Sequence, residues 1–367
     1  MKFVIILFLF IVTIKTQAQR DSIFDQGTYR TFIIHLPSDY NESNEYPLVF
    51  NLHGLGSNAI QQQLYSQFDA VADEEDLIVV YADAINNNWD LFGNTDVNFL
   101  SLLVDTLKER YSINECLFST GMSQGGFLSY KLACELPQPI SAIAVVTGNM
   151  LESLQSSCTG VGEVSVLHFH GTADQVVNYN GSFGVSPVEE SVQWWASENN
   201  CNASPTITSL PDIDQSDGST VEQYQYNECD DESEVVLYKI TNGGHTWPGA
   251  FPVPSLGNTN QDIDASELIG EFFTSHCQAS TDIADITPHN KIFIYPNPAQ
   301  HSFKVESLQK TDFELIIYNA LGKIIYYDPD IHESIQINCQ DWGKGFYFIQ
   351  ISSEIDRQTL YKIVITE

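Results

Sequence analysis

The sequence predicts an α/β fold, in which a mostly parallel sheet is flanked by helices, followed by a small all-β domain. Two observations predict it. Short apolar runs alternate with longer amphipathic runs over the first 277 residues, and several short runs are apolar throughout, as in strands buried on both faces of a sheet. After Cys277 the composition becomes polar, and short alternating strands with turn signals then reach the end of the chain.

The elements of the first domain can be placed in order. We expect strands at 29–36, 48–52, 77–81, 117–120, 142–147, 164–169 and 235–240. We expect helices at 99–111, 126–135, 189–198 and 265–275. Strands that alternate with helices in this way indicate parallel pairs joined by helical crossovers.

The second domain shows no convincing helix. We expect its strands at 313–318, 322–327, 345–352 and 360–365. Residues 278–291 are polar and form the expected linker, so that residues 19–277 and 292–367 make two separate domains. The second is about 75 residues long, within the usual range for a domain.

The first residues differ from the rest of the chain. Lys2 precedes an apolar run over 3–12, and a polar stretch with the small residue Ala18 follows. A basic start, a short hydrophobic run and a small residue before the cut are typical of a secretory signal, so we expect residues 1–18 to be a signal peptide. The run is short for a bilayer span, which disfavours the alternative of an uncleaved membrane anchor.

The acidity of the chain is uneven. The formal net charge is −33, with 15 Lys and Arg against 48 Asp and Glu. From Lys291 onward there are 7 basic and 10 acidic residues, so the first 290 residues hold 8 basic and 38 acidic ones. Such a surface repels nucleic acid and anionic lipid, and we expect no nucleic-acid partner.

The seven cysteines predict disulfides and no zinc site. Export permits disulfides, and the scattered spacing lacks the paired C-x-x-C pattern of a zinc knuckle. We favour Cys201 with Cys229, which flank a loop-rich insertion, and then Cys134 with Cys158. The odd number leaves at least one thiol unpaired.

The sharpest local motif is Gly-Met-Ser-Gln-Gly at 121–125. It lies between a predicted strand and a predicted helix, which is the context that a nucleophile elbow requires. The tight turn forces the serine into a strained conformation, and glycines on either side avoid a collision. Ser123 is therefore the expected nucleophile.

A serine hydroxyl needs a base, and the base needs an orienting carboxylate. In this arrangement the chain order is serine, acid, histidine. Asp174 follows the predicted strand 164–169, and His245 follows the strand 235–240 in a loop rich in glycine. We expect Ser123, Asp174 and His245 to form a catalytic triad. A turn-forming Asp174 and a structural His245 are the alternatives.

The turn His-Gly-Leu-Gly-Ser at 53–57 follows the strand 48–52 and matches the loop that supplies an oxyanion-hole amide. We expect the backbone N–H groups of Leu55 and Gln124 to stabilise the oxyanion. His53 is expected to orient this loop beside the substrate, and not to act as a base.

Five further aromatic residues each allow two interpretations. Trp89 and Trp247, with His53, could line an acyl pocket, and both tryptophans could equally belong to the core. His168 and His170 are spaced like two metal ligands on one strand face, but no third ligand accompanies them. We interpret them as structural histidines, and expect no metal and no cofactor.

Together these motifs resemble the secreted esterase family that includes polyhydroxybutyrate depolymerases, feruloyl esterases and acetylxylan esterases, which have the α/β-hydrolase fold. The resemblance covers 26–277 and includes the turn at 53–56, Asn88-Trp89, the residues 96–99, and the motifs around Ser123, Asp174 and His245. It implies hydrolysis of a carboxylic ester through an acyl-enzyme. Thr95 stands where many relatives have a second Asp, which weakens the subfamily assignment.

The end of the chain resembles a type IX secretion sorting domain. The resemblance rests on Pro-Asn-Pro at 296–298, the segment 317–323, Gly-Phe-Tyr at 345–347 and the final Lys362. It implies the type IX secretion machinery as a partner and an extracellular or cell-surface location. A small carbohydrate-binding β-sandwich is the alternative interpretation.

Three classes of function are considered for a sequence with these motifs. The leading one is a secreted serine esterase acting on a polyester, on feruloylated or acetylated polysaccharide, or on a small ester. A serine peptidase of the same fold would need a gating domain for which the chain lacks the length. A non-catalytic surface carbohydrate-binding protein on a hydrolase scaffold is disfavoured by the intact order of the three motifs.

Overall fold

A computed structural model describes residues 18–158, 164–277, 292–295, 299–307, 312–319, 323–352 and 359–365. The chain divides into two compact units between Ala279 and Ser280. The predicted signal peptide, apart from Ala18, and the predicted linker at 278–291 lie outside the described residues. Among the helices that are described, none has the length and apolar character to cross a membrane.

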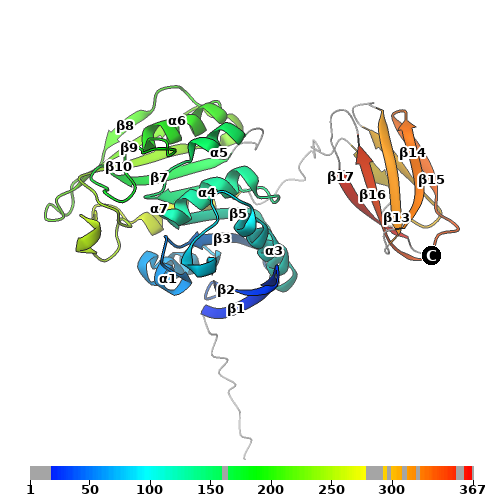
Figure 1. Cartoon of the computed structure of the whole chain (residues 1–367), viewed down its shortest axis with the longest axis horizontal. Helices are drawn as coiled ribbons and strands as arrows, with labels where there is room; N and C mark the ends of the chain where they lie inside the picture. The colour runs from blue at the N-terminus through cyan, green and yellow to red at the C-terminus, as the bar shows by residue number, and fades with distance from the viewer. Residues whose placement is uncertain are drawn as a thin grey trace, which may run out of the picture. The chain divides into compact units, whose positions relative to one another are not determined.

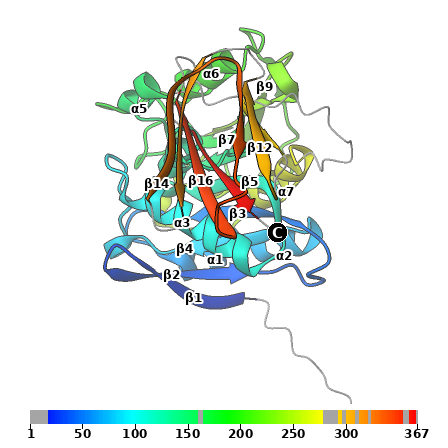
Figure 2. The same ribbon diagram turned by 90° about the vertical axis from the view of Figure 1, so that its right-hand side faces the viewer.

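The first unit is built on a ten-stranded sheet with the order β1-β2-β4-β3-β5-β6-β7-β10-β9-β8 (Figures 1 and 2). The six strands from β4 to β10 in this order run parallel. The outer strands at both edges pair antiparallel. The strands are β1 (Ala18–Asp25), β2 (Thr28–His35), β3 (Tyr46–Leu52), β4 (Ile78–Ala82), β5 (Ile113–Met122), β6 (Ala142–Val146), β7 (Ser165–Gly171), β8 (Thr206–Ser209), β9 (Thr220–Tyr226) and β10 (Val235–Thr241).

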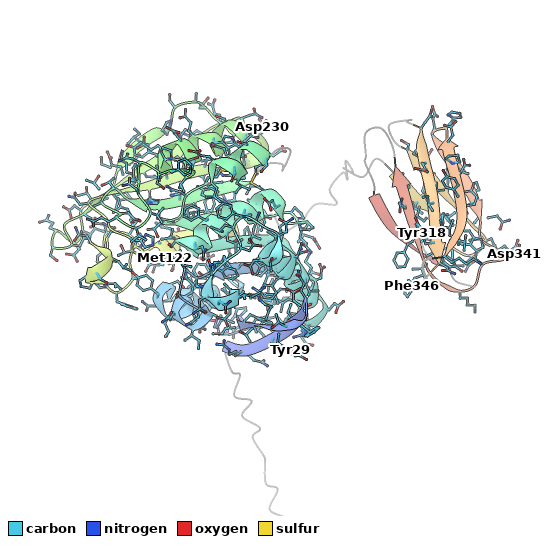
Figure 3. All side chains as sticks on the ribbon, viewed as in Figure 1. Tyr29, Met122, Asp230, Tyr318, Asp341 and Phe346 are labelled. Atoms are coloured by element: carbon cyan, nitrogen blue, oxygen red, sulfur yellow. A yellow bond between two sulfur atoms is a disulfide. The ribbon has the colours of Figure 1, made fainter. Side chains whose placement is uncertain are left out.

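Helices cover both faces of this sheet, and side chains fill the two layers between them (Figure 3). One core cluster joins a face of the sheet to α3, α4 and α6, and the other joins the opposite face to α2 and α7. Tyr29 and Asp230 lie towards opposite edges of the unit, with Met122 between them at the end of β5 (Figure 3). The helices are α1 (Ala59–Ser66), α2 (Phe68–Glu74), α3 (Thr95–Arg110), α4 (Gln124–Glu135), α5 (Glu152–Ser157), α6 (Val188–Glu198) and α7 (Ala265–Ser275).

All seven strands predicted for this unit are present, as β2 to β7 and β10. The strands β4 and β6 are buried at every residue, as their continuous apolar sequences predicted. The prediction missed β1, β8 and β9, because these outer strands carry many polar residues. Every residue of β8 is exposed, so its sequence has no apolar face to detect.

Three disulfides hold the first unit. Two are the expected pairs, Cys134–Cys158 and Cys201–Cys229. The third, Cys116–Cys277, joins residues 161 positions apart and ties the segment after α7 to the start of β5. Sequence spacing gave no sign of it. Cys339, in the second unit, is a buried free thiol.

The second unit consists of two antiparallel sheets, in the orders β11-β12-β15 and β14-β13-β16-β17. Its core contains apolar side chains from both sheets, among them Phe303, Leu315 and Ile349. The predicted strand at 322–327 is displaced to Ile324–Ile331, and the Pro-Asn-Pro motif lies outside the described residues. The strands are β11 (Ile292–Tyr295), β12 (Ser302–Ser307), β13 (Phe313–Asn319), β14 (Ile324–Ile331), β15 (Ser334–Asn338), β16 (Gly345–Ser352) and β17 (Thr359–Ile365).

Candidate active site

The parallel part of the sheet brings four predicted segments to one edge. Leu55, Ser123, Asp174 and His245 each follow the carboxyl end of a strand, namely β3, β5, β7 and β10. Because these strands are parallel, their carboxyl ends meet at the same edge, where α/β proteins place their ligands. Residues spread over nearly 200 positions of sequence thus converge.

Ser123 occupies the strained turn that its motif predicts. Its backbone has φ 55° and ψ −120°, between the end of β5 and the start of α4. A side chain at Gly125 would place its Cβ 2.1 Å from the carbonyl oxygen of Leu52, so only glycine fits there. The Ser123 amide donates to the carbonyl of Val146 at 2.8 Å, which holds the turn against β6. Strain of this kind persists only where the surroundings enforce it.

Asp174 and His245 are paired behind this serine. The Nδ1 atom of His245 lies 2.7 Å from Oδ2 of Asp174, and both side chains are buried. The other carboxylate oxygen, Oδ1, accepts from the backbone amides of Val176 and Val177 at 2.8 and 2.9 Å. Burial raises the pKa of Asp174, but hydrogen bonds from His170 and His245 outweigh it and hold the pKa well below its usual range. The carboxylate is therefore ionised and fixed in orientation.

Close approach of two loops explains the glycines around this pair. A Cβ at Gly171 would lie 2.2 Å from the carbonyl oxygen of Gly243, so the ends of β7 and β10 can meet only without a side chain there. The His245 amide donates to the carbonyl of Leu256 at 2.7 Å, which anchors its loop. The His-Gly and Gly-Gly-His sequences thus hold Asp174 and His245 within bonding distance.

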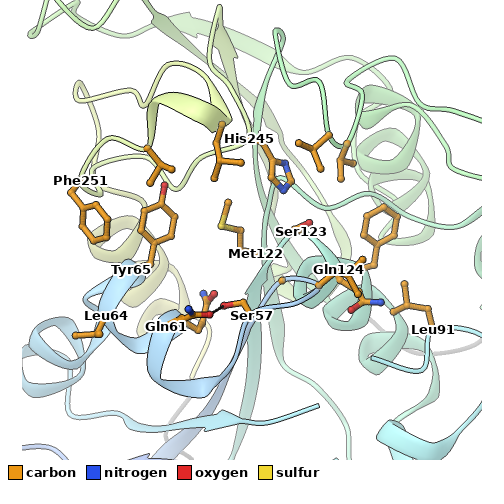
Figure 4. Close-up of a pocket in the computed structure, with 18 residues that line it drawn as sticks. Ser57, Gln61, Leu64, Tyr65, Leu91, Met122, Ser123, Gln124, His245 and Phe251 are labelled. Atoms are coloured by element: carbon orange, nitrogen blue, oxygen red, sulfur yellow. Dashed lines mark hydrogen bonds between the residues drawn. The ribbon is translucent and has the colours of Figure 1, made fainter. Parts of the chain in front are cut away.

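Ser123 and His245 both line one cavity, and Figure 4 shows the imidazole facing the serine hydroxyl across it. No hydrogen bond joins these two side chains in the described structure. Catalytic hydrogen bonds are often long in a ligand-free site and shorten when substrate binds. Nε2 of His245 likewise has no hydrogen-bond partner among the described residues.

His53 fixes the turn that follows β3. Its Nε2 atom accepts from the amide of Ala84 at 3.1 Å, so its Nδ1 atom carries the proton and donates to the carbonyl of Gly54 at 2.8 Å. Burial lowers the pKa of His53 and keeps the ring neutral. In a trans peptide the N–H group points opposite to the carbonyl. Holding the Gly54 carbonyl therefore sets the direction of the Leu55 N–H group.

Gln124 and Trp89 tie this turn to the serine. The Trp89 indole donates to the carbonyl of His53 at 2.8 Å, and its ring packs on the His53 ring. The Gln124 side chain accepts from the Trp89 amide at 3.0 Å and donates to the Trp89 carbonyl at 3.2 Å. Within the described structure, no hydrogen bond uses the amides of Leu55 or Gln124. Both N–H groups are therefore without a protein acceptor in the part of the chain that the structure describes.

The cavity has a volume of about 810 Å³ and is mainly apolar. Ser123 and His245 lie at its centre, and none of its described lining residues is an Asp, Glu, Lys or Arg. This contrasts with the strongly acidic chain. The apolar lining comes from α1, α4, the end of β5 and the loops after β3, β4, β7 and β10. It includes Leu55, Leu64, Leu91, Met122, Phe127, Val176, Phe251 and Leu256.

The structure corrects the predicted pocket residues. Trp89, Trp247 and His53 are buried at 2%, 1% and 0% exposure and do not line the cavity. The Trp247 indole instead donates to Ser266 at the start of α7, at 3.0 Å. The ring nitrogens of all three residues therefore have hydrogen-bond partners inside the protein.

The aromatic residues that do line the cavity were not predicted from the sequence. Tyr65 on α1 and Phe251 after β10 are packed edge to face, with ring centroids 5.1 Å apart. Phe127 on α4 lines another part of the cavity. The amphipathic pattern of α1 was the one available signal, and it was not strong enough to place Tyr65 beside Ser123.

His168 and His170 lie behind Asp174. Their facing nitrogens are 3.2 Å apart, and Nε2 of His170 lies 3.5 Å from Oδ2 of Asp174. The interpretation as structural histidines did not foresee the contact of His170 with the carboxylate. The one sequence feature that relates to this contact is the spacing of four residues between His170 and Asp174.

Two segments of the chain are similar to known protein families. Residues 26–201 match a family model described as a putative esterase, and residues 293–366 match a secretion system C-terminal sorting domain. Both resemblances predicted from sequence are thereby confirmed. The sorting domain also confirms an extracellular or cell-surface location for the protein.

Curated relatives agree with the first match. The chain is 33% identical over 166 residues to feruloyl esterase D of Neurospora crassa, which covers 41% of this chain and 56% of the relative. It is 26% identical over 226 residues to a bifunctional acetylxylan esterase/xylanase of Neocallimastix patriciarum, which covers 60% of this chain and 32% of that protein. The chain thus spans less than two thirds of the length of these relatives.

Among solved structures, an acetyl xylan esterase from Aspergillus awamori superposes with a TM-score of 0.50. The match covers 65% of this chain and 96% of that one, at 15% identity. At this identity the likeness concerns the fold alone. It confirms the predicted α/β-hydrolase fold of the first unit.

Proposed function

We propose that the protein is a secreted serine esterase that hydrolyses carboxylic esters through an acyl-enzyme. One observation carries the proposal. The strained Ser123 opens into an uncharged cavity that His245 also lines, and His245 is paired with an ionised Asp174 at 2.7 Å. The esterase family match over 26–201 supports it.

In the first step, Oγ of Ser123 attacks the ester carbonyl carbon while Nε2 of His245 takes the hydroxyl proton. The carbonyl becomes a tetrahedral oxyanion, and its C–O bond to the alcohol then breaks as His245 returns the proton to the leaving oxygen. Water attacks the resulting acyl-serine by the same route and releases the acid. Asp174 holds the imidazole and stabilises its cation.

The N–H groups of Leu55 and Gln124 are the proposed oxyanion donors. The Gln124 amide is also at the first turn of α4, where the helix dipole favours negative charge. Donors that are already oriented need no rearrangement when charge develops, and one such donor is worth about 3 kcal/mol. His53 and Trp89 are proposed as the supports of this site.

The cavity favours an uncharged ester with a bulky apolar part. A volume of about 810 Å³ far exceeds the needs of an acetyl group, and no lining residue offers a charge to an anionic substrate. The names of the relatives suggest acetylated xylan or feruloyl esters as substrates. We place feruloyl-type esters first, with acetylated xylan and polyhydroxybutyrate as the other substrates to test.

The proposed organisation is a signal peptide at 1–18, an esterase domain at 19–277, a linker at 278–291 and a sorting domain at 292–367. The type IX secretion machinery is the proposed partner of the sorting domain. The sorting family match at 293–366 supports this division.

The test is ester hydrolysis by the purified protein and its Ser123→Ala variant. The panel contains p-nitrophenyl acetate and butyrate, methyl ferulate, acetylated xylan and a polyhydroxybutyrate suspension. Turnover by the wild type alone would support the serine esterase, and faster turnover of methyl ferulate than of the acetate would support the bulky acyl group. If no substrate shows serine-dependent turnover, the carbohydrate-binding alternative takes its place.

A further inference from the structure

A row of buried polar rings leads away from Asp174. Tyr130 on α4 and His168 and His170 on β7 are each 0% exposed. The Tyr130 hydroxyl lies 2.7 Å from Nδ1 of His168, and Nε2 of His168 lies 3.2 Å from Nδ1 of His170. The Nε2 atom of His170 lies 2.9 Å from the carbonyl oxygen of Val177 and 3.5 Å from Oδ2 of Asp174.

The direction of each hydrogen bond follows from the last atom in the row. Both partners of His170 Nε2 are oxygens that only accept, so Nε2 must carry a proton. In a neutral ring, Nδ1 of His170 is then an acceptor, and Nε2 of His168 must donate to it. His168 Nδ1 is left as an acceptor, and the Tyr130 hydroxyl donates to it. All the protons therefore point towards Asp174.

We propose that His170 is a positioning residue for the catalytic carboxylate, and that Tyr130 and His168 fix its tautomer through this one-way chain. The inference rests on the proposed function for its catalytic part. His170 holds the carbonyl of Val177, whose own amide binds Oδ1 of Asp174, while its N–H group also faces Oδ2. It thus restrains the carboxylate and its loop together.

The geometry disfavours a metal site at the two histidines. A metal would need lone pairs on facing nitrogens, yet His168 Nε2 and His170 Nδ1 are 3.2 Å apart and share one proton. Burial lowers the pKa of His168 well below its ordinary value, and the neighbouring His170 adds to this. Burial also raises the pKa of Tyr130. The side chains of His168 and Tyr130 are therefore both neutral, as the proposed hydrogen-bond chain requires.

The hydrogen-bond chain from Tyr130 to His170 should affect the pH dependence of kcat/KM. The titratable groups that face His170 are His168, Asp174 and Tyr179, whose ring stands edge-on to the His170 ring and whose hydroxyl donates to Glu189. Asp174 faces only His170 and His245 among the described titratable groups. Without His170, the carboxylate has one donor fewer and interacts more strongly with the His245 cation. The acid limb of kcat/KM, which reports protonation of the base, then moves to higher pH.

The first test compares His170→Leu, His170→Gln and His35→Gln in the full chain. His170→Leu removes the donor, and His170→Gln keeps an amide N–H near the position of Nε2. His35 is the matched control, since it is 1% exposed and its Nε2 atom lies 2.9 Å from Asp73. We expect His170→Leu to lower kcat/KM by about tenfold, which is the order for a lost hydrogen bond to a charged group. We also expect the acid limb of its kcat/KM profile to move to higher pH.

His170→Gln should retain more activity than His170→Leu, and His35→Gln should leave the pH profile unchanged. A fall in kcat/KM for His170→Leu with an unmoved acid limb would overturn the positioning role and leave only a structural one. Full activity of His170→Leu, with loss of activity in Ser123→Ala, would refute this inference while the esterase stands.

The second test needs no substrate, so it also decides the hydrogen-bond chain if the protein hydrolyses no ester. In histidine-labelled full-length protein, the ¹⁵N shifts of each ring distinguish the two neutral tautomers and the cation. Single His→Gln variants assign the signals. We expect His168 and His170 to be neutral with the proton on Nε2 at neutral pH. A proton on Nδ1 of either ring, or a cationic His170, would overturn the inference.

Discussion

Two aspartates are buried to nearly the same extent in the first unit and have different partners. Asp96, 2% exposed, pairs with the guanidinium of Arg30 at 2.6 Å and accepts from the amide of Asp90 at 2.6 Å. Asp174, 3% exposed, pairs with His245 and contacts His170. Asp96 does not line the cavity, whereas the partner of Asp174 does.

The difference shows what distinguishes a structural carboxylate from one suited to catalysis. Arg30 is permanently charged, and its guanidinium also stacks 3.9 Å from the centre of the Phe99 ring, so this pair can only hold strands and loops together. Asp174 is paired instead with a histidine, the type of side chain that serves as a proton acceptor in catalysis. Burial is common to both sites, and the partner distinguishes the proposed catalytic carboxylate from the structural one.

The largest effect should come from Asp174→Asn. Two backbone amides bind Oδ1, so the amide oxygen of the new side chain would stay there and its NH₂ group would face His245. His245 would then adopt the tautomer with its proton on Nε2. In that tautomer Nε2 cannot accept the hydroxyl proton of Ser123. We expect kcat to fall by about four orders of magnitude, as measured for such a change in another triad, with little change in thermal stability.

Asp96→Asn should show the opposite pattern. Loss of this carboxylate leaves the charge of Arg30 buried without its closest partner, which costs about 3–5 kcal/mol. We expect urea unfolding, followed by tryptophan fluorescence, to shift to lower concentration, while kcat/KM of the remaining folded protein changes less than about tenfold. A 10⁴-fold loss of activity in Asp96→Asn would break the distinction between the two sites.

A smaller effect concerns acid stability. Burial lowers the pKa of His53 and of His168, so below about pH 6.5 the unfolded chain binds protons that the folded rings refuse. The free energy of unfolding should therefore fall as the pH decreases from 7 to 5, and His168→Gln should reduce that slope. Asp174, whose pKa is lowered, adds an acid-labile contribution only below about pH 4, where the unfolded carboxylate gains its proton. Chemical unfolding at several pH values measures this, and an equal slope in His168→Gln would contradict the assignment.

The core of the fold, and the position of Ser123, Asp174 and His245 at one edge of the sheet, could be predicted because each depends on a local pattern. Buried parallel strands are continuous apolar runs, and Ser123, Asp174 and His245 each follow one. The directions of Trp89 and Trp247 could not be predicted, because hydrogen bonds to His53 and Ser266 decide that they face inward. The cavity lining also depends on how α1 and the loop containing Phe251 pack, which sequence periodicity does not encode.

Long-range pairing marks a second limit of the sequence. Cys201–Cys229 and Cys134–Cys158 are 28 and 24 residues apart, and each closes a local segment that spacing can suggest. Cys116–Cys277 depends on the tertiary arrangement that brings the segment after α7 to β5. The contact between His170 and Asp174 was hidden for a related reason, since a strand residue and a loop residue meet only when the loop turns back.

The central claim is that Ser123 carries the acyl group. The most direct measurement is the mass of the protein after rapid mixing with p-nitrophenyl butyrate and acid quenching, followed by peptide mapping. The account predicts one added butyryl group, located on the peptide that contains Ser123, and no addition in Ser123→Ala. Hydrolysis of the ester with no acyl adduct on Ser123, or the same adduct in Ser123→Ala, would contradict it.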